Sequence, residues 1–196
     1  MNTLQPVLQK LGIWFLHNAP NDHELLRLAE AHNGWFTADS VKTAFKSIGE
    51  SLGEDQISKW LLNYDLPDAV EGDSGKRVGL ILAGNLPLVG FHDILCSVVA
   101  GHNVAIKASS VDIVLPKRVV HEIEKIEPKL KGRITFVEGK LGKVDAVIAT
   151  GSSNTMRYFD AYFGHLPHLF RAQRTGVAVL DGLESEDELK ALGDDM

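Results

Sequence analysis

The chain has 196 residues, of which 44% are hydrophobic and 23% charged, so it can bury a sizeable core and global disorder is excluded. Its formal net charge is −6, and no stretch interleaves Lys and Arg with aromatic residues, which argues against a nucleic-acid-binding protein. A single cysteine, Cys96, excludes an intramolecular disulfide and a site with several thiolate ligands, as expected in a reducing cytoplasm.

Targeting and metal-binding signals are absent from the sequence pattern. Residues 1–10 lack a basic segment followed by an apolar run, and the longest apolar stretch, 78–89, is too short to cross a bilayer. The eight histidines are scattered, and Pro167 breaks the helical spacing between His165 and His168. We therefore predict a cytoplasmic, unexported protein with no membrane span and no metal site.

The first part of the chain has the periodicity of short helices. Apolar residues recur at helical spacing up to about Tyr64, and Thr37 is expected to cap the N-terminus of one helix. A further helix is expected at 54–63. The segment 67–77 is rich in Gly, Pro, Asp and Ser and predicts a linker between a helical region, 1–66, and a second domain, 78–196.

Beyond that linker the period changes to short buried strands that alternate with helices. The run 78–83 is a continuous apolar stretch typical of a strand buried on both faces of a parallel sheet. The pattern predicts further strands at 103–107, 133–137, 144–149 and 176–180, and helices at 91–100, 112–127, 155–163 and 186–192. This alternation predicts an α/β fold with a doubly wound, mostly parallel, Rossmann-like sheet.

Ligands of open parallel sheets bind beyond the carboxyl ends of the strands, so the residues that follow strands are the candidates. Asn85 follows the first strand; its amide can donate to a developing oxyanion or can simply satisfy its own turn. Lys107 ends the second strand, and Ser109 and Ser110 after it can bind ribose or phosphate oxygens. The alternative for Lys107 is a solvated side chain at the end of a strand.

A third candidate follows the strand at 144–149, where Thr150, Gly151 and Ser152 lead into a helix. The free N–H groups and the dipole of that helix favour an anion, although Ser152 can equally act as a helix cap. Neither a phosphate-binding loop at 72–77 nor a Gly-x-Gly-x-x-Gly motif after the first strand is present, so a nucleotide must be held in another way. Cys96 is expected to pack in the core because apolar residues surround it in its predicted helix.

The runs 78–93, 100–107 and 145–155, in this order, resemble the aldehyde dehydrogenase superfamily. Within it, the segments 157–164 and 174–180 resemble the LuxC-like fatty acyl-CoA reductases. The similarity covers most of residues 36–196, and it implies a cofactor domain like that of an aldehyde dehydrogenase.

The resemblance also implies roles for individual residues. Asn85 is expected to donate to the oxyanion formed from a thioester carbonyl, Lys107 to contact the adenosine ribose, and Gly151 and Ser152 to lie against the cofactor diphosphate. Relatives that use NAD often carry a glutamate three residues after that lysine, where this chain has Ser110. Because a serine would not repel a 2′-phosphate, we expect NADPH rather than NADH as the cofactor.

The catalytic cysteine of this family is expected beyond Met196, since Cys96 comes too early in the order of motifs. The sequence therefore predicts the N-terminal, cofactor-binding part of an NADPH-dependent reductase that converts a fatty acyl thioester, of coenzyme A or an acyl carrier, into an aldehyde. This part alone is expected to be inactive. An exposed edge strand favours a homo-oligomer, and an acyl-transferring protein is the other expected partner.

Two other hypotheses fit the sequence. One is a non-catalytic nucleotide-binding or partner-binding protein that lacks the nucleophile. The other is an enzyme of the same superfamily that works on a different reaction, either an aldehyde dehydrogenase in the oxidative direction or an acyl-phosphate reductase.

Overall fold

The computed structural model describes residues 4–66, 75–172 and 177–194. In chain order its helices are α1 (Gln5–Ile13), the π-helical η1 (Trp14–Asn18), the short 3₁₀ helix η2 (Ala19–Asn21), α2 (His23–His32), α3 (Ala38–Ser51), α4 (Glu54–Leu61), α5 (Phe91–Val99), α6 (Val114–Ile126), the 3₁₀ helix η3 (Pro128–Leu130), α7 (Ser153–Phe163) and α8 (Glu186–Asp194). The strands are β1 (Arg77–Ile81), β2 (Asn103–Lys107), β3 (Ile134–Phe136), β4 (Ala146–Thr150) and β5 (His168–Arg171).

The five strands form one sheet in the order β3-β2-β1-β4-β5, and every pair of neighbours is parallel. This is the strand order of a Rossmann-like sheet, and it confirms the predicted α/β class. The register is continuous across the centre, where Leu80 of β1 pairs with Ile106 of β2 on one side and Ile148 of β4 on the other.

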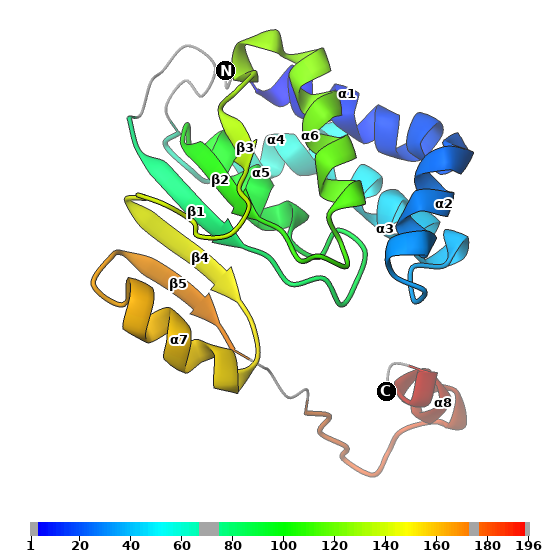
Figure 1. Ribbon diagram of the computed structural model, residues 1–196. Coiled ribbons are helices and arrows are strands. Elements are labelled where there is room, and N and C mark those ends of the chain that lie inside the picture. The colour runs from blue at the N-terminus through cyan, green and yellow to red at the C-terminus, as the bar shows by residue number, and fades with distance from the viewer. Residues whose placement is uncertain (1–3, 67–74, 173–176, 195–196) are drawn as a thin grey trace.

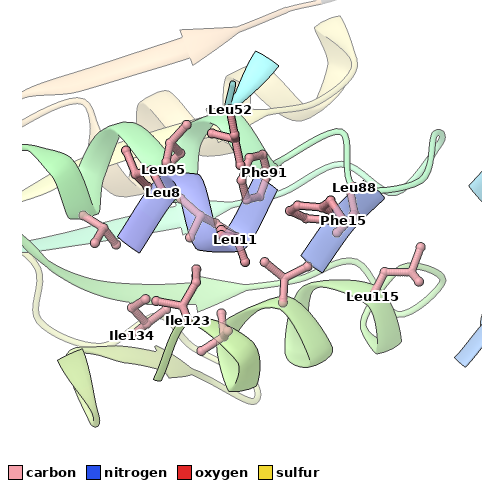
Figure 2. Packing of buried hydrophobic residues seen from close by; sticks show 14 of the residues in the cluster. Leu8, Leu11, Phe15, Leu52, Leu88, Phe91, Leu95, Leu115, Ile123 and Ile134 are labelled. Atoms are coloured by element: carbon pink, nitrogen blue, oxygen red, sulfur yellow. The ribbon is translucent and has the colours of Figure 1, made fainter. Parts of the chain in front are cut away.

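The N-terminal helices cover one face of this sheet. Because side chains alternate along a strand, Val78 and Leu80 point to one face and Gly79 points to the other. Val78 and Leu80 belong to a large buried cluster with residues of α1 to α6. Figure 1 shows these helices together on one side of the sheet, and Figure 2 shows the packing of their buried side chains, which include Leu8, Leu11, Phe91, Leu95 and Ile123. The helices at 4–61 thus share a core with the sheet.

Local signals explain where the N-terminal helices begin. The side chain of Thr37 accepts a hydrogen bond from the Ser40 N–H at 3.2 Å and caps α3, as predicted. Asp22 does the same for α2, accepting from the Leu25 N–H at 3.0 Å. The guanidinium of Arg118 on α6 lies 5.3 Å from the ring of Trp14 and so links α6 to η1.

The opposite face of the sheet carries α7 and the connection from β3 to β4. Phe159 of α7 packs in a smaller buried cluster with Ala105, Leu141, Val144, Val147 and Ala149. Gly79 makes this packing tight, because a Cβ at this position would overlap the side chain of Leu141. The connection 137–145 therefore covers part of this face of the sheet as a loop that contains no helix.

The C-terminal part differs from the prediction in one element. Residues 177–180 of the expected strand 176–180 form no strand, and their side chains are exposed. Instead β5 lies at 168–171, where it extends the sheet beside β4, and Arg171 forms an ion pair at 2.6 Å with the buried Asp93 of α5. Pairing with β4 decided this position, since an apolar run becomes a strand only where a sheet edge can bind it.

Two further expectations concern the linker and a membrane span. Residues 67–74 of the predicted linker lie outside the described residues, and Arg77, its last residue, begins β1. Among the helices of the described residues, none is long and apolar enough to cross a membrane. None of the described residues of α8 is buried, and Figure 1 shows this helix apart from the sheet.

Candidate functional site

A cleft of about 790 Å³ lies at the carboxyl ends of β1, β2 and β4, on the face of the sheet that carries α7. In this sheet the chain runs outward from β1 through β2 in one direction and from β4 to β5 in the other, so the strand order reverses between β1 and β4. A crevice at such a reversal is where open α/β sheets bind their ligands. The cleft is lined by Ile81, Lys107, Lys140, Leu141, Gly142, Thr150, Gly151, Thr155, Tyr158, Phe159, Tyr162 and Phe163.

The structure brings three of the predicted site residues together here. Lys107 comes from the end of β2, Thr150 from the end of β4, and Gly151 from the turn into α7. The exposed Lys107 donates from Nζ to the carbonyl oxygen of Gly139 at 2.6 Å. This bond holds the ammonium group against the β3 to β4 connection, at the border of the cleft.

The N-terminus of α7 opens beside these residues. The N–H of Gly151 donates to the carbonyl of Arg171 at 3.1 Å, so it belongs to the sheet rather than to a free anion seat. Ser152 caps the helix, accepting from the Thr155 N–H at 3.4 Å. Among the described residues the N–H groups of Ser153 and Asn154 have no acceptor, and they are the groups through which this helix can bind an anion.

Gly151 packs closely against side chains of α7. A Cβ at this position would lie 3.2 Å from Cβ of Thr155 and 3.3 Å from the ring of Phe159. A larger residue at this position would therefore require the side chain of Thr155 or Phe159 to shift.

Sequence reasoning missed the aromatic wall of the cleft. Tyr158 and Tyr162 lie one helical turn apart on α7, and 61% and 68% of their surfaces are exposed. Two exposed tyrosines at this spacing, directly after a Gly-Ser turn, were the available signal. Lys140 was missed as well, because it stands in a connection without periodicity, between Gly139 and Gly142 at φ values of 74° and 75°.

The electrostatic character of the cleft differs from that of the whole chain. The chain carries a net charge of −6, yet the residues that line the cleft include two lysines and no carboxylate. Cations, hydroxyls and aromatic rings around a pocket of this size suit a ligand that has both anionic groups and a planar ring.

The other predicted residues do not line this cleft. Ser109 packs against Gly84, where a Cβ would lie 2.6 Å from its Oγ, and Ser110 is exposed. Asn85 is exposed on the loop between β1 and α5, and its side chain makes no hydrogen bond with the described residues. The structure thus separates Asn85 from the group formed by Lys107, Thr150 and Gly151.

The loop that carries Asn85 is strained. Leu88 has a φ of 56°, a left-handed conformation that costs a residue with a side chain about 1–2 kcal/mol. Its N–H donates at 3.0 Å to Oδ2 of Asp112, which is 4% exposed. Burial raises the pKa of Asp112 to about 6, although the bond from Leu88 lowers it.

Cys96 lies half-buried on α5, with Sγ 3.3 Å from Nε2 of His92. Burial, followed by the negative charge of Asp93, raises the pKa of the thiol, and Arg171 offsets this only in part. Its side chain borders an apolar groove of about 320 Å³ over β4 and β5, on the opposite side of the sheet from the α7 cleft. A thiol with a raised pKa is a poor nucleophile, so Cys96 has the properties of a packing residue.

A comparison with protein-family models found no match for the chain, and a search of curated proteins found none either. Within the described parts of the chain, no group of three or more His, Cys, Asp or Glu side chains is placed to hold a metal ion.

Proposed function

We propose that the cleft beside α7 binds a nicotinamide dinucleotide, with NADPH preferred to NADH. The observation that carries this proposal is the convergence of Lys107, at the end of β2, and the adjacent Thr150 and Gly151, at the end of β4, on one cleft at the point where the strand order reverses. These residues fit such a cofactor, because they provide a cation, a hydroxyl and a glycine beside a helix N-terminus.

The preference for NADPH is supported by the charge of the cleft. Its lining includes Lys107 and Lys140, and no carboxylate that would repel a 2′-phosphate. Tyr158 and Tyr162 offer exposed rings against which a planar heterocycle can stack. Ser110 does not line the cleft, so the two lysines are the better argument for this preference.

We further propose that the chain is the cofactor-binding part of a LuxC-like acyl-CoA reductase with a cofactor domain like that of an aldehyde dehydrogenase. When bound, the cofactor would supply hydride. The task of this chain is then to bind and orient it, and to offer the amide of Asn85 as an uncharged donor to an oxyanion. By the resemblance Cys96 is not the nucleophile, which agrees with the raised pKa of its thiol.

A second candidate is a nucleotide-binding protein without catalytic activity. The observation in its favour is that the thiol of Cys96, the single cysteine of the sequence, has a raised pKa although His92 Nε2 lies 3.3 Å from its Sγ. Both candidates require the cleft to bind a nucleotide, so they differ in chemistry and share the same site.

The first experiment is a calorimetric titration of the chain with NADPH and with NADH. We expect NADPH to bind more tightly, and Lys107→Ala to weaken its binding about tenfold, the effect of losing one charge-assisted hydrogen bond. Lys59→Ala is the matched control, because Lys59 is an exposed lysine on α4, outside the cleft. Absence of binding at millimolar NADPH, or equal affinities for wild type and Lys107→Ala, would contradict the proposal.

The second experiment separates the two candidates. The product of the natural gene, isolated from its source cells, is assayed for NADPH-dependent reduction of a fatty acyl-CoA. For a reductase we expect aldehyde to form, and we expect Asn85→Ala to lower kcat by roughly 10²–10³-fold, as for other oxyanion donors. Nucleotide binding without any reduction would favour the non-catalytic protein.

A further inference from the structure

The loop between β1 and α5, residues 82–90, is called the Asn85 loop. Its first half is fixed by several contacts: the Leu82 N–H donates to the carbonyl of Lys107 at 3.1 Å, and the carbonyl of Gly84 accepts from the side chain of Asn33 at 3.4 Å. Gly84 also packs against Ser109. These contacts all precede Asn85.

After Asn85, the side chain of Leu88 is buried in the core and the Val89 N–H donates to the carbonyl of Leu86 at 3.3 Å, while Asp112 provides the side-chain acceptor for this part of the loop. Leu88 takes the left-handed conformation that residues with a side chain rarely adopt, with a φ of 56°. Its N–H donates to Oδ2 of Asp112 at 3.0 Å, a bond buried from solvent. Asp112 is itself held in a tight turn, since its N–H donates to the carbonyl of Ser109 at 3.2 Å. The β2 to α6 connection thus fixes the loop on both sides of Asn85.

Asp112 differs from the other buried carboxylates. Asp93 is paired with Arg171, and Glu122 is paired with Arg118 and Lys125. Within the described ranges Asp112 has no cationic partner, and its Oδ1 is buried without any hydrogen-bond partner. Burying such a group is costly, and one backbone bond offsets only part of that cost. A carboxylate at this position is therefore not explained by a gain in folding stability. Its one observed hydrogen bond among the described residues is the one that it accepts from the Leu88 N–H.

We propose that Asp112 is a positioning residue for Asn85: its carboxylate holds Leu88 in the left-handed conformation and so fixes the course of the loop that presents the Asn85 amide. The side chain of Asn85 has no partner among the described residues, so its direction depends on the backbone that carries it. The positioning role rests on the proposed function of Asn85, whereas the effect of Asp112 on the loop does not.

The test uses Asp112→Leu and Asp112→Asn in the full chain. Leucine has a similar shape and removes both the acceptor and the unpartnered oxygen, so the variant is expected to stay folded. We expect the NMR order parameter of the Asn85 backbone N–H to fall below about 0.6, and hydrogen exchange of the Leu88 N–H to speed up at least about tenfold. Asparagine keeps an acceptor oxygen and is expected to restore both values.

Glu122→Met is the matched control, since it also replaces a buried carboxylate on the same segment of chain, away from the loop. It is expected to lower the melting temperature and to leave both readouts at Asn85 and Leu88 unchanged. An ordered loop in folded Asp112→Leu would overturn the proposal. If that variant does not fold, a mobile loop in Asp112→Asn, which keeps the acceptor, would overturn it as well, and an ordered one would support it.

A nucleotide titration of Asp112→Leu separates this inference from the proposed function. Asp112 does not line the cleft, so NADPH affinity should equal that of the wild type. If the wild type binds no nucleotide while the loop still loosens in Asp112→Leu, the proposed function fails and the link from Asp112 to the loop stands. If binding persists and the loop stays ordered, the inference alone fails.

Discussion

The two faces of the sheet are built for different purposes. One face is covered by α1 to α6, and its buried cluster draws side chains from all of these helices. The other face carries α7 and the connection 137–145, and its buried cluster consists of Ala105, Leu141, Val144, Val147, Ala149 and Phe159. The large cluster supplies most of the apolar burial, whereas the small one leaves room for the cleft. The larger part of the buried core and the proposed binding cleft therefore lie on opposite faces of one sheet.

The difference between the faces follows from how the strands are connected. Helices lead from β1 to β2 and from β2 to β3, and both pack on the face that the N-terminal helices cover. The path from β3 to β4 crosses the other face as a loop, so β1 and β2 lack a covering helix there. Leu141 closes part of this gap over Gly79 and also borders the cleft.

The largest expected effect is a loss of folding stability on the face of the sheet that α1 to α6 cover. Phe15 is fully buried, with ring centroids 4.9 Å from Trp14, 5.7 Å from Phe45 and 5.4 Å from Phe91. We expect Phe15→Ala to lower the free energy of unfolding by about 3–5 kcal/mol in urea denaturation. Phe159→Ala, on the other face, should cost less stability yet weaken NADPH binding. Equal losses of stability in Phe15→Ala and Phe159→Ala, or unchanged NADPH binding in Phe159→Ala, would contradict the proposed difference between the two faces.

The next effect concerns Asp112, whose pKa of about 6 in the folded state lies above the unfolded value near 3.8. A raised pKa means that this group stabilises the folded state fully below pH 4, and that this contribution is lost as the pH rises through 6. Relative to Asp112→Asn, the wild type should lose at most about 3 kcal/mol of unfolding free energy between pH 4 and pH 7. Parallel pH profiles for the two proteins would contradict the raised pKa.

A smaller effect is expected at Gly79, on the face of the sheet that carries α7. A Cβ there overlaps the side chain of Leu141, so Gly79→Ala must displace that side chain, at about 1–2 kcal/mol. The displaced Leu141 borders the cleft, and NADPH binding should weaken in the same variant. Adding Leu141→Ala should recover part of the loss, and a double variant whose loss equals the sum of the two single losses would show that these residues do not interact.

The smallest effect is expected from α8. None of its described residues is buried, and Leu183 and Leu189 before and within it are exposed. Removing residues 177–194 should change the free energy of unfolding by no more than about 0.5 kcal/mol. A larger loss, measured by thermal unfolding at two protein concentrations, would show that this segment packs on the sheet or on a second copy of the chain.

Local patterns predicted much of the fold. The strand at 103–107 and the cap at Thr37 follow from short-range rules, and the structure confirms both. The strand at 176–180 was wrong for the residues the structure describes, because an apolar run is a strand only where a neighbour pairs with it. Lys107 and Gly151 were chosen because they follow strands, and the rule for parallel sheets brings them to one cleft.

The sequence by itself determined the α/β class, the parallel sheet and the strand ends that carry Lys107, Thr150 and Gly151, since these depend on periodicity and on turn residues near each other in the chain. The tertiary structure alone decided that Lys140 and Tyr158 complete the cleft, and that Asn85 lies outside it. It also decided that Asp112 holds Leu88, because this bond joins two connections that no local pattern relates. Burial and strand order are properties of the assembled sheet.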